Sequence, residues 1–157
     1  MVHYLVEQIH EALAAAHEGD RVLALFNDLE ATASLEDVPV LLVALQHDDA
    51  DFFTREMFGQ ILCGFDQPEL LEPLLVAFDR NLDEGHDNDG FQEALWGLVE
   101  ATPERSAELL HQLREREPST VKADTIRWLL KFCSDEPEEN TGDRPSPMHR
   151  ILRRLRR

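Results

Sequence analysis

The chain has 157 residues, of which 43% are hydrophobic, and its formal net charge is −17. This length and apolar content suit one compact domain or a short repeat array and argue against wholesale disorder. An acidic chain repels phosphate backbones, so we expect no nucleic-acid partner, whereas a basic protein would be attracted.

Helical patterning begins at residue 2 and continues to residue 133. Apolar residues recur at the three- and four-residue spacing of amphipathic helices. We expect eight helices, over 2–17, 21–31, a third after Ser34 or Asp37, then 52–65, 68–82, 90–101, 104–116 and 120–133. The boundary residues are, in chain order, Gly19 as a stop, Asp20 and Asp51 as N-caps, and Pro68, Pro103 and Pro118 at helix starts.

A weak internal repeat relates the fourth and sixth of these helices. At an offset of 38 residues, the matching pairs are Phe53 with Phe91, Phe58 with Trp96, and Gly59 with Gly97. A period near 40 residues is typical of HEAT-like helix pairs. We therefore predict an all-α fold, with antiparallel helix pairs in a short HEAT-like α-α array of about eight helices. A compact up-and-down bundle is the alternative. In an array, the two glycines would let a neighbouring helix approach closely.

The helical array is predicted to span residues 1–133. Residues 134–147 are polar and Pro-rich without apolar periodicity, which indicates a linker. Residues 148–157 are predicted to form a basic amphipathic tail, with apolar residues on one helical face: Met148, Ile151, Leu152 and Leu155. Such a tail could bind an anionic membrane, but docking on the acidic body of its own or another chain, or plain disorder, is favoured.

Acidic residues concentrate in the loops expected at one end of the array. Alternate loops of an antiparallel array share an end, which places 46–51 beside 79–89. Asp79 and four further acids lie in the second segment alone. The acids that we predict to contact a partner are Asp48, Asp49, Asp51, Asp83, Glu84, Asp87 and Asp89. Ordinary N-capping and a solubilising charge are the alternative interpretations.

No catalytic or metal-binding pattern stands out. Glu7-x-x-His10 and Glu108-x-x-His111 have the spacing of di-iron bundle ligands. On a helical wheel, however, both pairs turn away from the apolar stripe and face water. Phosphate-loop, dinucleotide and nucleophile-elbow motifs do not occur. We therefore expect no cofactor, no metal ion and no enzymatic activity.

The two cysteines and the adjacent charged residues Arg55 and Glu56 also fit structural roles. Cys63 and Cys133 lie in apolar runs, which favours buried free thiols in a reducing cytoplasm. Arg55 and Glu56 are interpreted as an ordinary ion pair on a helix surface. No segment approaches the roughly 20 apolar residues of a membrane span, and residues 1–10 do not have a signal-peptide pattern. A cytoplasmic location is expected.

Residues 55–132 resemble the helical immunity proteins of bacterial polymorphic toxin systems. The residues that carry the likeness are Arg55, Glu56, Met57, Phe58 and Gly59, then Gln60, Ile61 and Leu62, and finally Trp128, Leu129 and Leu130. The resemblance implies a small cytoplasmic antidote that binds a cognate toxin and blocks it, and the acidity of this chain would suit a basic toxin. The basic tail is not part of the pattern.

Three functional hypotheses follow for a protein of this kind. The first is a non-enzymatic immunity protein that neutralises a cognate toxin domain through its acidic loops. The second is a HEAT-like cytoplasmic adaptor that binds another protein and whose tail regulates docking. An enzyme is the third and least favoured reading.

Overall fold

The structure is a computed structural model that describes residues 1–15, 19–116 and 120–133. Within these ranges the chain is all-α and contains no strand. The helices are α1 (Val2–Ala14), α2 (Gly19–Thr32), α3 (Val38–Leu45), α4 (Phe52–Cys63), α5 (Leu71–Asp83), α6 (Asp89–Ala101), α7 (Pro103–Glu115) and α8 (Ala123–Leu130). Two 3-10 turns, η1 (Leu35–Asp37) and η2 (Pro68–Leu70), precede α3 and α5. The predicted linker, 134–147, and tail, 148–157, lie outside the described residues.

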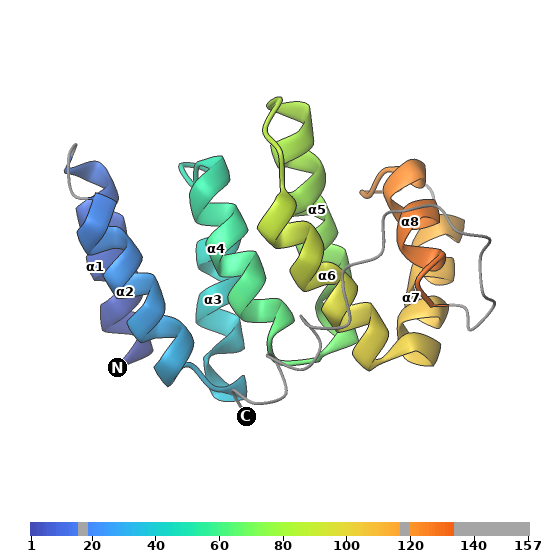
Figure 1. Ribbon diagram of the computed structural model, residues 1–157, viewed down its shortest axis with the longest axis horizontal. Coiled ribbons are helices and arrows are strands. Elements are labelled where there is room, and N and C mark those ends of the chain that lie inside the picture. The colour runs from blue at the N-terminus through green and yellow to red at the C-terminus, as the bar shows by residue number, and fades with distance from the viewer. Residues whose placement is uncertain (16–18, 117–119, 134–157) are drawn as a thin grey trace.

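The eight described helices form an array of antiparallel neighbours, as the sequence predicts (Figure 1). Helix α1 packs on α2, α3 packs on α4, and α7 packs on α8. Helix α4 also contacts α5 and lies along α6, so it occupies the centre of the array. Because successive helices alternate in direction, the α3–α4 and α5–α6 connections emerge at the same end.

Most of the predicted helix starts are confirmed. The side chain of Asp51 accepts a hydrogen bond from the Thr54 amide at 2.8 Å and so caps α4. Ser34 and Asp37 form a capping box around η1. Pro68 begins η2, and Pro103 is the first residue of α7, where its missing N–H costs nothing.

Several boundaries differ from the prediction, among them the starts of α2 and α8. Gly19 does not end the first helix but begins α2, which places Asp20 inside the first turn. Helix α8 begins at Ala123 rather than at residue 120. The cause of the second difference is a tertiary contact: the carboxylate of Asp79, on α5, accepts the Lys122 amide at 2.7 Å and fixes where α8 starts.

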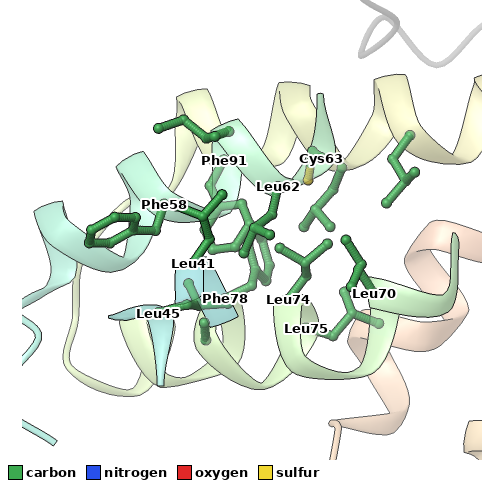
Figure 2. Close-up of a cluster of buried hydrophobic side chains, with 14 of the residues drawn as sticks. Leu41, Leu45, Phe58, Leu62, Cys63, Leu70, Leu74, Leu75, Phe78 and Phe91 are labelled. Atoms are coloured by element: carbon green, nitrogen blue, oxygen red, sulfur yellow. The ribbon is translucent and has the colours of Figure 1, made fainter. Parts of the chain in front are cut away.

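The hydrophobic core lies between the helix layers. Figure 2 shows side chains from α3, α4, α5 and α6 converging on one cluster, among them Leu41, Leu45, Phe58, Leu62, Leu74, Leu75, Phe78 and Phe91. Phe58 and Phe91 are both fully buried. This cluster joins the four central helices into one unit and so supports the loops at their ends.

Gly59 has the role that the repeat predicts. The Phe91 ring of α6 lies directly over it, and a Cβ at residue 59 would come within 2.3 Å of Phe91 Cζ. Phe91 is fully buried and packs edge-on against Phe78, with ring centroids 5.7 Å apart, so a shift of its ring would disturb the core around it. Helix α4 can therefore approach α6 closely only because residue 59 has no side chain.

We predict that Gly59→Ala lowers the free energy of unfolding by about 1–3 kcal/mol, since a methyl group forced into a filled core displaces its neighbours. The substitution would otherwise stabilise a helix by up to about 1 kcal/mol. Gly19→Ala is the matched control, because a Cβ there meets nothing within 4 Å. Urea unfolding measures both variants, and a Gly59→Ala protein as stable as the wild type would contradict the packing.

Candidate functional site

The predicted partner-binding residues gather at one end of the array. Residues 46–51 connect α3 to α4, and residues 84–88 connect α5 to α6, at the same end of the molecule (Figure 1). The first connection contains three of the predicted acids, and the second contains or adjoins the other four. All seven are exposed: Asp48, Asp49, Asp51, Asp83, Glu84, Asp87 and Asp89. We call these two connections, with Asp83 and Asp89, the acidic surface.

A buried arginine holds the two connections together. Arg55, on α4, is 1% exposed. Its guanidinium donates to the backbone carbonyl of Ala50 and to the carboxylate of Glu84, and its Nε donates to Asn81 Oδ1 at 2.6 Å. One side chain therefore binds the first connection, the body of α5 and the second connection. Each of its three nitrogens has a partner, which a buried cation requires.

Two buried asparagines extend this network. Asn81 Nδ2 donates to the Phe52 carbonyl at 3.1 Å and to Asn88 Oδ1 at 2.8 Å. Asn88 Nδ2 donates in turn to the Phe78 carbonyl at 3.0 Å. The nitrogen of each amide donates within the network and the oxygen of each amide accepts, so both side chains are held in a defined orientation. We call Arg55, Asn81, Asn88 and Glu84 the Arg55 cluster.

Further contacts link the two connections. The Phe52 and His86 rings stack with centroids 3.8 Å apart and an interplanar angle of 14°. Arg80 pairs with Glu84 at 3.0 Å and donates to the Asp48 carbonyl at 3.1 Å. Gly85 supplies the left-handed turn, φ 81°, that follows α5. Both connections are thus fixed by side chains as well as by backbone.

The seven predicted acids divide into two groups. Three have structural partners: Asp51 caps α4, Glu84 pairs with Arg55 and Arg80, and Asp83 pairs with Lys122. The other four, Asp48, Asp49, Asp87 and Asp89, form no ion pair with a lysine or arginine in the described part of the chain. Only His47 Nδ1 comes near one of them, at 4.0 Å from Asp49. These four carboxylates are the ones available to a partner.

Two predictions about individual residues are wrong. Asp79 is not a surface acid of this end: it is buried and accepts hydrogen bonds from the Thr125 hydroxyl and the Lys122 amide. Arg55 and Glu56 are not an exposed ion pair. They point to different neighbours, because Arg55 is buried against Glu84 while Glu56 accepts the Phe91 amide at 3.2 Å, near the start of α6.

The Arg55 cluster was not expected from the sequence, although one signal was present. Asn81 follows Leu74 and Phe78 at the four- and three-residue spacing of the apolar face of α5, and all three are buried. An amide on an apolar stripe must find partners inside the protein. That position could have indicated a polar cluster, but not that Arg55 would supply its cation.

A hollow of about 590 Å³ adjoins the acidic surface between α5 and the residues before α8. Its lining includes Val76, Asp83, Glu84 and Lys122. The two acids are already paired, with Lys122 and with Arg55 and Arg80. The third acid of the lining, Asp79, is likewise bonded to the Lys122 amide and the Thr125 hydroxyl, so we do not treat the hollow as the centre of the site.

The histidine motifs do not converge on a metal-binding arrangement among the described residues. His10 departs from the prediction that it faces water: it is half-buried, with its ring centroid 5.6 Å from that of His47 and 6.5 Å from that of Phe58. Burial, and then the neighbouring His47, lower the pKa of His10. Glu7 and His111 are exposed as predicted. None of the described helices is long and apolar enough to cross a membrane.

The chain matches none of the protein-family models, curated proteins or solved structures with which it was compared. The class of protein is therefore described from its structure alone. It is an all-α antiparallel array in which a buried polar cluster positions an acidic surface.

We predict that Arg55→Met destabilises the protein by roughly 2–4 kcal/mol, because Asn81 and the Ala50 carbonyl lose their donor. The lower end of this range falls under the roughly 3–5 kcal/mol of a wholly buried ion pair, since Glu84 is 37% exposed and keeps Arg80. Arg127→Met is the matched control, because Arg127 is exposed and its partner among the described residues is the neighbouring, exposed Asp124. Urea unfolding of both variants tests this. A wild-type midpoint for Arg55→Met would show that the cluster does not support the fold.

We predict that low pH weakens the Arg55–Glu84 interaction. Burial opposes ionisation of Glu84, but the hydrogen bonds and charges of Arg55 and Arg80 outweigh it and hold the pKa of Glu84 below its ordinary value of 4.5. Its ionised form therefore stabilises the folded protein above that value, and the contribution is lost as the pH falls through the lowered pKa. Unfolding measured between about pH 6 and pH 3 should show a smaller loss of stability in Glu84→Gln than in the wild type. Parallel curves would contradict the assignment.

Proposed function

We propose that this protein is an immunity protein that binds a cognate bacterial toxin domain and blocks it through the acidic surface. The observation that carries the proposal is the exposure and lack of a cationic partner, within the described residues, of four carboxylates, those of Asp48, Asp49, Asp87 and Asp89. They are exposed, without a lysine or arginine partner among the described residues, and mounted on connections that the Arg55 cluster holds in place. The partner is a protein with a basic surface.

A fixed surface of this kind favours binding for two physical reasons. Loops that are already ordered lose little conformational entropy when a partner arrives. Several carboxylates of one sign at one end of the molecule also attract a basic partner from a distance and accelerate association. The same charges would repel the phosphates of a nucleic acid, which supports a protein as the partner.

The toxin as the partner is supported by the resemblance of residues 55–132 to helical immunity proteins. In this structure the motif residues serve the architecture: Arg55 anchors the acidic surface, Phe58 fills the core, and Gly59 receives Phe91. The motif residues thus stabilise the array. Contact with a toxin would be made by the two acidic connections that they support.

A cytoplasmic adaptor is the second candidate, and one feature of α3 favours it. The sequence of α3, VPVLLVAL, has no polar residue, yet Val43 is 68% exposed and Pro39 is also exposed. A helix that is apolar all round is normally covered. An adaptor would use this apolar face to bind its partner, whereas the proposed immunity protein would use the acidic surface.

The decisive experiment begins with capture of the partner, using the full chain as bait in its source cells and mass spectrometry as the readout. A dominant partner should carry a domain that arrests growth when expressed alone, and co-expression of this chain should restore growth. Capture of partners whose domains do not inhibit growth would contradict immunity and favour the adaptor.

We predict that the combined change Asp48→Asn, Asp49→Asn, Asp87→Asn and Asp89→Asn weakens binding to that partner about tenfold or more, mainly by slowing association at low salt. The matched control removes the same number of charges elsewhere: Asp28→Asn, Glu30→Gln, Glu36→Gln and Glu104→Gln, all exposed in the wild type. Association and dissociation rates for both variants separate the two surfaces. Equal affinities would remove the acidic surface from the interface.

A further inference from the structure

Two histidines face each other where the first helix pair meets the rest of the array. His10 lies on α1 and His47 lies in the connection between α3 and α4, and their ring centroids are 5.6 Å apart. His10 is half-buried, and its ring also packs edge-on against Phe58 of α4, with centroids 6.5 Å apart. One titratable side chain of α1 therefore contacts both the connection and the core.

The α1–α2 pair occupies one end of the array (Figure 1). It therefore has a neighbouring pair on one side only, as a terminal repeat does. Helix α1 packs on α2 and α3, and Phe26 of α2 packs edge-on against Phe53 and Phe58 of α4, with ring centroids 6.1 and 5.1 Å apart. Such a terminal unit can open locally while the rest of the molecule stays folded.

The carboxylates on α1 have partners other than His10. Glu7 lies 3.4 Å from His3, and Glu11 accepts a hydrogen bond from Gln8 at 2.7 Å. In the described part of the chain, His10 itself forms no ion pair with an acid. A proton on its ring is therefore added without a compensating negative charge from its own helix.

The other described helices around His10 supply no compensating charge either. Helix α3 contains no charged residue. Arg21 of α2 donates to Gln8 at 3.0 Å and thus adds a positive charge beside α1. The two charged residues of α4, Arg55 and Glu56, are bonded in the Arg55 cluster and at the start of α6. The group that faces His10 is thus a second imidazole.

In the connection between α3 and α4, the close acid lies beside His47. The Asp49 amide donates to His47 Nδ1 at 3.3 Å, and the Asp49 carboxylate lies 4.0 Å from the same nitrogen. Asp48, the other acid before it, is exposed. A proton on His47 Nδ1 displaces the amide but attracts the carboxylate, so His47 can carry a charge while it faces His10.

The neutral form of His10 is the one that suits this junction. Burial, and then the neighbouring His47, lower the pKa of His10 below its ordinary value of 6.5. Opening of the helix pair removes both constraints, so the open state binds the proton more readily than the closed state. The closed state is therefore favoured above that value and loses stability as the pH falls below it.

We propose that His10 and His47 form a pH-sensitive contact that lets the α1–α2 pair open from α3 and α4 at mildly acidic pH. When both rings carry a proton, two positive charges face each other across the junction, and His10 gains by moving from the edge of the core into water. Opening exposes the rings of Phe26 and Phe58, which are buried in the closed array. An apolar surface thus appears in response to acid, whatever the partner of the acidic surface is.

Hydrogen exchange of the full chain tests the proposal. After correction for the intrinsic exchange rates, the protection of α1 and α2 amides should fall about threefold or more between about pH 7.5 and about pH 5.5. Amides of α7, which lies toward the other end of the array (Figure 1), should keep their protection in the same samples. This pH range lies above the ordinary pKa values of carboxyl groups, so the carboxylates stay ionised throughout.

Two histidine variants give the comparison its meaning. His10→Gln should abolish the selective fall in protection, because glutamine does not titrate. His3→Gln is the matched control, since His3 is an exposed histidine of the same helix, and it should behave like the wild type. No fall in the wild type, an equal fall in α7, a selective fall that survives in His10→Gln, or its loss in His3→Gln would overturn the proposal.

A third variant keeps the test decisive if His10→Gln already leaves α1 and α2 unprotected at the higher pH. His47 is exposed, so His47→Gln removes one of the two facing charges without entering the core. The pH-dependent fall in protection should then be smaller than in the wild type. An unchanged fall would show that the facing rings are not its cause, and would overturn the proposal.

Discussion

The interaction on which this end of the molecule depends is the burial of one guanidinium group. Removing an arginine from water costs several kcal/mol unless its donors are satisfied inside the protein. Here a carbonyl, an amide and a carboxylate satisfy Arg55, and each acceptor comes from a different segment: residue 50, α5 and the connection after α5. Apolar contacts tolerate sliding, but directed hydrogen bonds to a buried charge do not. The loops are ordered because the arginine would otherwise lack its partners.

Helix α4 also fixes the positions of α5 and α6. Consecutive residues of α4 turn in different directions, with Arg55 toward α5 and Glu56 toward the start of α6. One turn further along, Gly59 accepts the ring of Phe91. The start of α6 is therefore fixed by a hydrogen bond and by packing at once, and this determines where Asp89 projects. The position of the exposed acids is a consequence of interior chemistry.

The sequence predicts the architecture well because its signals are local. Apolar spacing, the Asp51 cap and the prolines at 68 and 103 are properties of short segments, and the helices they predict are present. The gathering of two acidic loops at one end also follows, because antiparallel topology alone dictates it. The roles of individual acids do not follow in the same way. Asp79 and Asp83 lie one turn apart on α5, yet one is buried beneath the start of α8 and the other is exposed beside Lys122.

What the sequence could not provide are contacts between residues far apart in the chain. Arg55 and Glu84 are 29 positions apart, and nothing local distinguishes that pair from the adjacent Arg55 and Glu56. The start of α8 likewise depends on Asp79, 43 residues before Lys122. Such contacts decide which charged side chains have structural partners and which are free to bind. The topology was therefore enough to locate the candidate site. The three-dimensional structure was needed to tell its paired acids from its unpaired ones.

The most direct test of this account is the backbone mobility of the two connections in the free protein, measured as NMR order parameters for residues 46–51 and 84–88. If the Arg55 cluster orders both connections before any partner binds, their order parameters will be close to those of the helices, about 0.85. Values below about 0.6 would mean that the loops are flexible on the fast timescale, and would contradict a preformed acidic surface.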